Sequence, residues 1–458
     1  MPIPLIIQGL TEGVSSIPYA VPVLRTAPWV LLLAALKYYF GGARNTSERV
    51  MHSKVIMVTG GTSGIGAAVV YELAKRGAQI ILLTKHAPSD LFLVDYIEDL
   101  RRSTGNQLIY AEQVDLSSLH SIRTFATRWV DNAPPRRLDM IILCAQTTIP
   151  SGVARKPTVD GLDEEWQINY LANFHLLSIL SPALRAQPPD RDVRIIFATC
   201  SSYAGATLDL AEAEKRVIDS SSSKPSSKPG QGQAKGADTK KQQQQQKQQQ
   251  QKKEQEKQEQ QKQKQKKHNM YRMSKLALMI FAQSFQKHLS SYKRPDDCPP
   301  NARVLIVDPG LSRTPGTRRW LTGGSLWGLL LYLLTWPLWW LVLKSPQQGA
   351  QSFLYAAMDA KFGRGTGPWF IRECSEVGKY VRPEVCDEEV GRRVWEFSEK
   401  QIQEKEKEAA IFRALEKKVR EELEKEKKKA ASSSSTSATG SSSSKTQTQT
   451  KTKTPKTK

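Results

Sequence analysis

The chain has 458 residues, a net charge of +22 and a mean hydropathy of −0.47. Such a charge would suit a nucleic-acid-binding protein, but no zinc-finger, helix-turn-helix or RNA-binding pattern accompanies it, so nucleic acid is not an expected partner. Much of the charge lies in two low-complexity segments: 220–268 holds 13 Lys against 4 acidic residues, and 431–458 holds 5 Lys and no acidic residue.

These two segments contain too few apolar side chains to form a core, so both are expected to be disordered. The rest suits one α/β domain over 51–400, interrupted by the Gln/Lys insertion at 220–268. A charged helix over 401–430 and a tail over 431–458 would follow. The five cysteines show no metal-ligand spacing, so we expect reduced thiols and no metal site.

The first 50 residues contain an apolar run, 27–36, bordered by Arg25 and Lys37. A helix that spans a bilayer needs about 20 apolar residues, and Arg25 interrupts this one. We therefore expect residues 1–50 to form an interfacial or monotopic anchor rather than a cleaved signal peptide. A helix packed on the domain is the alternative.

From Lys54 onward, short β-branched runs alternate with helical patterns. The expected strands are 54–59, 79–84, 107–113, 138–144, 193–199 and 302–308, and the expected helices include 67–76, 163–186 and 270–289. This alternation predicts right-handed βαβ units, and hence an α/β fold with a doubly wound, Rossmann-like parallel sheet. In such folds ligands bind at the carboxyl ends of the strands.

Two further segments stand outside this pattern. Residues 320–343 carry no charge and are rich in Trp and Leu, with Pro337 inside and Gly323-Gly324 near the start. We expect a kinked insertion that dips into a membrane or lipid monolayer and roofs the substrate cleft; a buried pair of lid helices is the alternative. Residues 395–429 are dense in Glu and Lys and predict a long solvated helix, with a partner helix as the alternative.

The strongest local motif is a glycine-rich loop between the first strand and the first helix. Gly60, Gly64 and Gly66 allow close backbone approach to a pyrophosphate, and a helix N-terminus presents its N–H groups there. The loop predicts dinucleotide binding. Its expected contacts are Gly60, Thr62, Ser63, Gly64, Ile65 and Gly66.

This Thr-Gly-x-x-x-Gly-x-Gly spacing resembles the short-chain dehydrogenase/reductase family, and five later motifs extend the resemblance. Asp115 matches the aspartate near the adenine ring, and Pro309-Gly310 with Thr314 matches the turn beside the nicotinamide. The residues that match the catalytic set are Asn169, Ser202, Tyr271 and Lys275. The adjacent Ser201 could be confused with Ser202, which is preferred because Ala204-Gly205 follows it at the matching distance.

The chemistry of these residues agrees with the resemblance. Tyr271 and Lys275 are four positions apart on one helix and share a face. A nearby ammonium should lower the pKa of the Tyr271 phenol and make it a usable general acid or base. Ser202 could donate a hydrogen bond to the substrate oxygen, and Asn169 could hold a water in the proton path.

The cofactor is expected to be NADP(H), with NAD(H) as a possibility. An acidic residue after the second strand would bind the ribose hydroxyls of NAD, but this chain has Lys85 there, and a cation suits a 2′-phosphate.

Closer resemblances point to one branch of the family. Residues 169–177 and 344–355 look like retinol dehydrogenase-type enzymes, and the apolar segments are similar to those of fungal members on endoplasmic reticulum and lipid droplets. This implies an oxidoreductase that faces the cytosol and interconverts a lipophilic carbonyl and alcohol at a membrane or lipid-droplet surface.

Two departures from the family pattern keep a second function open. The family's Asn-Asn-Ala-Gly stretch is replaced by 143–146, Leu-Cys-Ala-Gln, and the Gln/Lys insertion separates Ser202 from Tyr271. The alternative is a catalytically idle, cofactor-binding membrane protein that acts as a scaffold. The oligomeric state stays open.

Overall fold

The computed structural model describes residues 20–150, 153–211, 213, 270–365 and 367–436. The chain forms two compact units, Met1–Gln403 and Glu404–Lys458. The predicted Gln/Lys insertion at 220–268 lies outside the described residues, as do 1–19 and the tail beyond 436.

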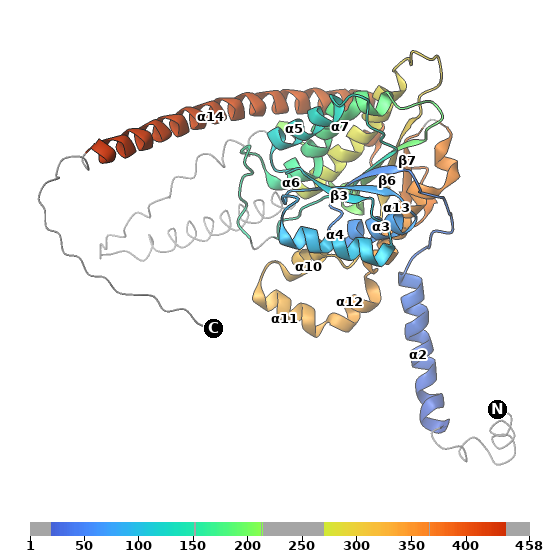
Figure 1. Cartoon of the computed structure of the whole chain (residues 1–458). Coiled ribbons are helices and arrows are strands. Elements are labelled where there is room, and N and C mark those ends of the chain that lie inside the picture. Colours follow the sequence, from blue (N-terminus) through green and yellow to red (C-terminus); the bar gives the residue numbers. More distant parts are fainter. Residues whose placement is uncertain (1–19, 151–152, 212, 214–269, 366, 437–458) are drawn as a thin grey trace, which may run out of the picture. The chain divides into compact units, whose positions relative to one another are not determined.

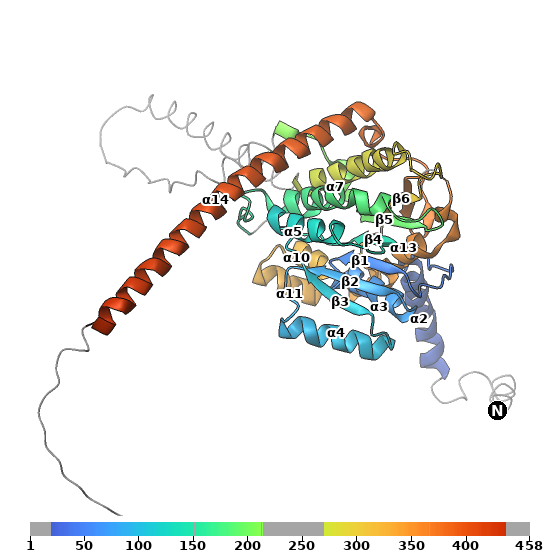
Figure 2. The same cartoon turned by 45° about the horizontal axis from the view of Figure 1, so that its top comes forward.

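An eight-stranded sheet forms the centre of the first unit, in the order β3-β2-β1-β4-β5-β6-β7-β8 (Figures 1 and 2). All neighbours are parallel except β7 and β8, which are antiparallel. The strands are β1 (Val55–Thr59), β2 (Gln79–Thr84), β3 (Ile109–Gln113), β4 (Met140–Leu143), β5 (Val193–Ala198), β6 (Ala302–Asp308), β7 (Trp369–Arg372) and β8 (Ser375–Glu376). The first six confirm the predicted strands and the Rossmann-like fold.

Helices cover both faces of the sheet (Figure 2). One face carries α3 (Gly64–Lys75), α4 (Leu91–Thr104) and α13 (Pro346–Met358); the other carries α5 (Leu119–Val130), α7 (Ala172–Arg185) and the helix 270–290. Side chains of β1 alternate between the two cores: Ile56 and Val58 enter one, Val55 and Met57 the other. The strands are rich in apolar β-branched residues because helices bury both faces of the sheet. The ends of the strands are therefore the places where a ligand can bind.

The N-terminal apolar run lies in α2 (Ala20–Phe40), which extends beyond the domain core. Its side chains are largely exposed, with Trp29 68% and Leu31 69% accessible. Only its C-terminal end touches the domain, where the Lys37 ammonium lies 4.8 Å from the centre of the Trp340 ring and donates to the Trp340 carbonyl. Among the described helices, none combines the length and apolarity that crossing a bilayer would require.

The apolar segment 320–343 folds into short helices rather than one continuous helix. These are the end of α10 (Pro315–Thr322), α11 (Leu326–Leu334) and α12 (Trp336–Val342). The predicted interruptions are found, since Gly323 ends α10 with a left-handed φ of +58° and Pro337 lies in the first turn of α12. Most apolar side chains of α11 and α12 are exposed, which contradicts the alternative of a buried helix pair.

The charged C-terminal helix is longer than predicted: α14 spans Glu388–Thr436. It includes 431–436, which was expected to belong to the tail; the sequence contains no Gly or Pro between Gly391 and Gly440 that would stop the helix. In the first unit, Ser398 and Gln401 of α14 are buried and accept or share hydrogen bonds with aromatic side chains of the domain. The start of the helix is therefore part of the domain core.

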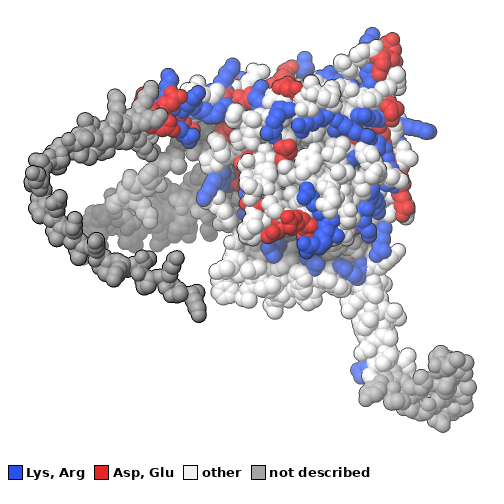
Figure 3. Space-filling model, in the orientation of Figure 1, with Lys and Arg blue, Asp and Glu red and all other residues white. Residues whose placement is uncertain are grey.

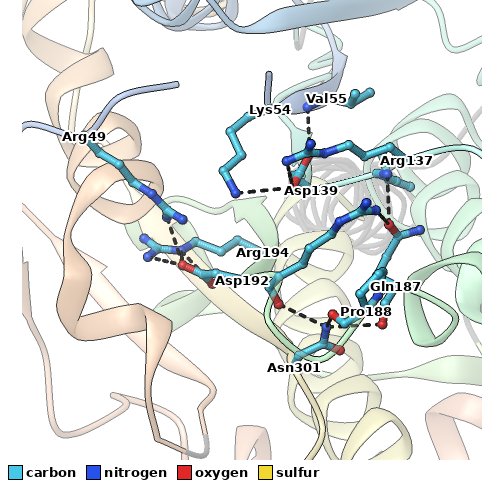
Figure 4. A network of polar contacts seen from close by, with 12 residues as sticks. Arg49, Lys54, Val55, Arg137, Asp139, Gln187, Pro188, Asp192, Arg194 and Asn301 are labelled. Carbon is cyan, nitrogen blue, oxygen red and sulfur yellow. Dashed lines mark hydrogen bonds and ion pairs between the residues drawn. The ribbon is translucent and has the colours of Figure 1, made fainter. Parts of the chain in front are cut away.

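Ion pairs close the amino-terminal edge of the sheet (Figure 4). The guanidinium of Arg137 donates to both oxygens of buried Asp139 at 2.6 and 3.0 Å. Nearby, Asp192 pairs with Arg49 at 2.9 Å and with Arg194 at 2.6 Å. A pocket of about 480 Å³ lies beside this second group and is lined in part by Arg49, Asp192 and Arg194. These charges already satisfy one another at the edge opposite to the glycine loop, so we assign them to stability.

Candidate active site

The glycine-rich loop connects β1 to α3 in the strained geometry that glycine permits. Gly60 and Gly64 have φ values of +68° and +59°. A Cβ at Gly66 would lie 2.2 Å from the Gly60 carbonyl oxygen, and one at Gly60 would lie 2.8 Å from the Ala145 nitrogen. The backbone is therefore packed against itself and against the end of β4, which leaves no room for side chains.

The first turn of α3 has polar groups free to meet a ligand. Ser63 occupies the N-cap position, yet its side chain makes no capping hydrogen bond, and Thr62 and Ser63 are both exposed. The loop is held from behind by Tyr96, whose hydroxyl donates to the Gly61 carbonyl at 2.9 Å. Sequence reasoning missed Tyr96, because nothing in the sequence connects this residue of α4 with the loop.

Asn169 lies in a short π-helix, Gln167–Leu171, inside the predicted helix 163–186. Its side-chain oxygen accepts from the Thr147 nitrogen at 2.7 Å, and its amide nitrogen donates to the Thr147 carbonyl at 3.0 Å and to Ser274 Oγ at 3.4 Å. Insertions of this kind frequently mark functional sites. The Asn169 side chain therefore connects the segment after β4 to the helix that carries Tyr271. Both ends of its amide group already form hydrogen bonds with protein groups.

Ser202 and Tyr271 meet at the carboxyl end of β5. Ser202 lies in the 3₁₀ turn Ser201–Gly205 that follows β5, and Tyr271 lies in the first turn of the helix 270–290. The Cys200 sulfur is 2.9 Å from Ser202 Oγ and 3.4 Å from the Tyr271 hydroxyl oxygen. Ser201 turns instead to Asp308. The two predicted hydroxyls are thus brought together across the long insertion.

Lys275 shares the helix face of Tyr271, as predicted. Its side chain is fully buried, and the ammonium donates to the Ala198 carbonyl at 3.3 Å and lies 5.9 Å from the centre of the Tyr271 ring. Burial lowers the pKa of Lys275, although nearby Cys200, Cys144 and Asp308 oppose this shift. The hydrogen bond fixes the ammonium at the end of β5.

The expected direction of the Tyr271 pKa shift is wrong for these side chains. Burial raises the pKa of Tyr271 well above its usual value, and Cys200 adds to the shift both through its charge and as a hydrogen-bond partner. The charges of Glu165 and Asp308 act in the same direction. The phenol therefore stays protonated at neutral pH, which is the form that donates a proton.

The Pro309-Gly310 turn lies at the end of β6, next to the glycine loop. Gly310 has φ +73°, and its nitrogen donates to the side chain of buried Asp308 at 3.0 Å. Thr314 caps α10, and its methyl carbon lies 3.4 Å from the position that a Cβ of Gly64 would occupy. The turn and the loop therefore border the same space.

The two residues expected near the nucleoside lie at the ends of the neighbouring strands. Lys85 follows β2 directly and is exposed. Asp115 follows β3, and its carboxylate accepts from the backbone nitrogen of Ser117 at 2.8 Å and from its hydroxyl at 2.7 Å. Their position on the β2–β3 side of the loop is where an adenosine would extend in this fold.

The polar groups of this edge fit a dinucleotide. Two buried hydroxyls, Thr199 Oγ1 and Ser312 Oγ, have no hydrogen-bond partner among the described residues. Buried polar groups are normally satisfied, so each is available to a bound molecule. Thr199 follows β5 next to the turn that carries Ser202, and Ser312 lies in the turn after β6, on the two strands that border the expected nicotinamide position. A glycine cradle, exposed hydroxyls and these unpaired groups together match the donors that a dinucleotide needs.

Comparisons with known proteins agree with this geometry. Residues 54–208 match the sequence profile of short chain dehydrogenase. The chain is 40% identical to the uncharacterized oxidoreductase pbr1 of Schizosaccharomyces pombe over 83% of this chain and 89% of that protein. It is 34% identical to the uncharacterized oxidoreductase YNL181W of Saccharomyces cerevisiae over 90% and 95% of the two chains. Retinol dehydrogenase 13 of mouse is 28% identical over 79% and 87%.

The fold and site define an NAD(P)-dependent oxidoreductase. The chain belongs to the short-chain dehydrogenase/reductase family, in its retinol dehydrogenase-like branch.

Proposed function

We propose that this enzyme uses NADP(H) to interconvert a lipophilic carbonyl and its alcohol at a membrane or lipid-droplet surface. The proposed direction is reduction of the carbonyl. The observation that carries the proposal is the meeting of the Ser202 and Tyr271 hydroxyls around one sulfur at the carboxyl end of β5. The two hydroxyls could donate to one carbonyl oxygen, as carbonyl reduction requires.

The proton chemistry favours reduction. Bound NADPH would supply the hydride. The raised pKa of Tyr271 keeps the phenol protonated, so it can deliver a proton to the oxygen as negative charge develops there. Ser202 would hold that oxygen in place, and buried Lys275 would stabilise the phenolate left behind. Asn169 would orient this helix through Thr147 and Ser274.

Three groups of contacts would hold the dinucleotide. The N–H groups of the loop Gly60–Gly66, with the hydroxyls of Thr62 and Ser63, suit the pyrophosphate. The turn formed by Pro309, Gly310 and Thr314 suits the nicotinamide. Asp115 suits the adenine, and exposed Lys85 suits a 2′-phosphate, which is why we propose NADP(H) rather than NAD(H).

Exposed apolar helices support a lipid surface as the working environment. In α11 and α12, the exposed side chains include Leu326, Trp327, Leu334 and Trp340, with Leu326 85% accessible. Figure 3 shows the uncharged surface of these helices below a part of the domain that carries Lys, Arg, Asp and Glu side chains. The Arg313 guanidinium lies 4.7 Å from the centre of the Trp336 ring. An apolar surface next to basic side chains suits an anionic lipid layer.

The apolar helices are also near the proposed cleft. α10 begins directly after the Pro309-Gly310 turn, and a Cβ at Gly324 would lie 2.8 Å from a methyl carbon of Val153 and 3.5 Å from Pro150. Pro150 belongs to the segment after β4 that Asn169 pins. A substrate that leaves the lipid beside α11 would therefore reach this edge of the sheet over apolar surface, which supports a lipophilic substrate.

Turnover of purified full-length protein tests the chemical part of the proposal. NADPH consumption is measured with retinal, a ketosteroid and a long-chain aldehyde, for the wild type and Tyr271→Phe. We expect at least one carbonyl to be reduced and the variant to lose about a hundredfold or more in kcat, the size of general-acid catalysis. Equal rates in the two proteins would refute the enzymatic reading and favour the scaffold.

Flotation with liposomes tests the lipid part. We expect the wild type to float with vesicles that contain phosphatidylserine, and a variant with Leu326→Ser, Trp327→Ser and Leu334→Ser to float less. A matched control replaces exposed apolar side chains of the second unit, Ile411→Ser and Phe412→Ser. If the wild type stays with the soluble fraction, or both variants float equally well, the lipid-surface proposal is wrong.

A further inference from the structure

The thiol of Cys200 lies between the two hydroxyls of the proposed site. Its sulfur is 2.9 Å from Ser202 Oγ and 3.4 Å from the Tyr271 hydroxyl oxygen. Cys200 is the N-cap residue of the turn Ser201–Gly205 and has extended backbone angles, φ −155° and ψ 158°. Cys200 thus ends the extended strand, and the 3₁₀ turn that follows brings the side chain of Ser202 back to its sulfur.

Other roles of this cysteine have little support. All five cysteines are free, so Cys200 forms no disulfide. Among the described residues, no cluster of His, Cys, Asp and Glu is arranged to hold a metal ion. What distinguishes Cys200 is its contact with two hydroxyls that the proposed reaction uses.

We infer that Cys200 is a positioning residue, whose sulfur aims the hydroxyls of Tyr271 and Ser202 at a common point. This rests on the proposed carbonyl reduction. A carbonyl oxygen that accepts from both hydroxyls must approach the point at which they converge. The sulfur is a weak acceptor, so the substrate oxygen can displace it without a large loss, whereas an apolar side chain would leave both hydroxyls free to rotate.

The electrostatics of Tyr271 agree with this geometry. A phenol that donates a hydrogen bond to sulfur is stabilised in its neutral form. Burial is the largest cause of the raised pKa of Tyr271, and Cys200 is the next. Removal of the thiol leaves Tyr271 buried and leaves Lys275 beside it. Loss of Cys200 should therefore shift the pKa of Tyr271 downward without changing the residues that Tyr271 packs against.

Two substitutions at this position separate positioning from packing. Cys200→Ala removes the sulfur, and Cys200→Ser keeps a small side chain that can accept from both hydroxyls. Cys386→Ala, at an exposed cysteine, is the control for loss of a thiol. For each protein we would measure the pH dependence of kcat/KM for carbonyl reduction, the KM for NADPH and the thermal midpoint.

Positioning predicts a specific pattern. Cys200→Ala should lower kcat about fivefold, the size of one hydrogen bond, and should move the alkaline fall of kcat/KM to lower pH, with an unchanged KM for NADPH. Cys200→Ser should restore both, and Cys386→Ala should match the wild type. A role in packing alone would lower the thermal midpoint and leave the pH profile in place, which would overturn the inference.

A second readout is independent of turnover. Protein labelled with ¹³C at the ζ carbon of tyrosine gives a signal for Tyr271 that disappears in Tyr271→Phe. We expect its phenolate form to appear at lower pH in Cys200→Ala than in the wild type, with Cys200→Ser resembling the wild type. Identical titrations in all three proteins would refute the inference about Cys200. Absence of reductase activity in the wild type would refute the proposed function instead.

Discussion

Ser201 Oγ donates a 2.8 Å hydrogen bond to Oδ2 of Asp308, across the gap between the ends of β5 and β6. Arg372 of β7 completes the arrangement, because its guanidinium donates to the same carboxylate oxygen and to Ser201 Oγ, each at 3.0 Å. Two adjacent serines thus have opposite surroundings: Ser201 joins three strands, whereas Ser202 faces Tyr271 by way of Cys200.

The two serines should therefore respond differently to replacement by alanine. Ser202→Ala removes a donor to the substrate oxygen and should lower kcat by about a hundredfold with little change in stability. Ser201→Ala should lower the free energy of unfolding by about 1 kcal/mol and leave kcat within a few-fold of the wild type. Urea denaturation and steady-state kinetics on both variants check this, and the reverse pattern would mean that Ser201 is the catalytic serine.

The glycine loop offers a test of cofactor binding. A Cβ at Gly66 would lie 2.2 Å from the Gly60 carbonyl oxygen, so Gly66→Ala must displace the loop. We expect its Kd for NADPH, measured by the fluorescence of the bound nucleotide, to rise tenfold or more, about 1.4 kcal/mol. Gly378→Ala is the matched control, since nothing lies within 4 Å of the added methyl group. Equal affinities in both variants would remove the loop from the binding site.

The sequence was sufficient for the fold because each predicted strand is a continuous apolar run between turn signals. β7 was missed because its four residues, Trp369–Arg372, follow Pro368 and are too short to show a period, and β8 has only two residues. β7 forms because β6 offers an unpaired edge, and β8 then pairs with β7; both are tertiary effects.

The candidate site was predictable as a set of residues but not as an arrangement. Tyr271 and Lys275 could be paired by helical spacing alone, and their pairing with Ser202 came from the family resemblance. The direction of the Tyr271 pKa shift could not be predicted, because it depends on burial and on Cys200, and neither is visible in the spacing. The same limit applies to Asn169, whose amide is held by the backbone of Thr147.

Cofactor preference should follow the charge after β2. Lys85 is exposed at the end of that strand, so Lys85→Asp places a negative charge where a 2′-phosphate would bind. We expect the KM for NADPH to rise about twofold to fivefold, the size of one exposed charge contact, while the KM for NADH falls or stays constant. Lys75→Asp, at the far end of α3, controls for net charge. An unchanged ratio of the two KM values would contradict the choice of NADP(H).

The ion pairs at the opposite edge of the sheet predict a pH-dependent stability that is separate from catalysis. Asp139 is 1% exposed and accepts from Arg137, from the Val55 nitrogen at 2.9 Å and from Lys54 at 3.4 Å (Figure 4). Burial alone would raise the pKa of Asp139, but these hydrogen bonds and charges outweigh it and lower the pKa. The carboxylate therefore stabilises the fold above its unfolded pKa, near 3.8, and this contribution is lost as the pH falls through the lower folded value.

Asp139→Asn should consequently lower the free energy of unfolding by about 1–2 kcal/mol at neutral pH, because it removes the charged acceptor of Arg137 and Lys54, whose own charges remain partly exposed to solvent. The difference from the wild type should stay constant down to about pH 5 and shrink below about pH 4. Asp296→Asn, which removes an exposed partner of Arg294, should show a smaller effect at every pH. Urea denaturation across this range measures both, and a difference that grows toward low pH would contradict the lowered pKa of Asp139. Activity of the folded variant should match the wild type, since Asp139 lies at the amino-terminal edge of the sheet and the hydroxyls of the proposed active site lie at the carboxyl edge.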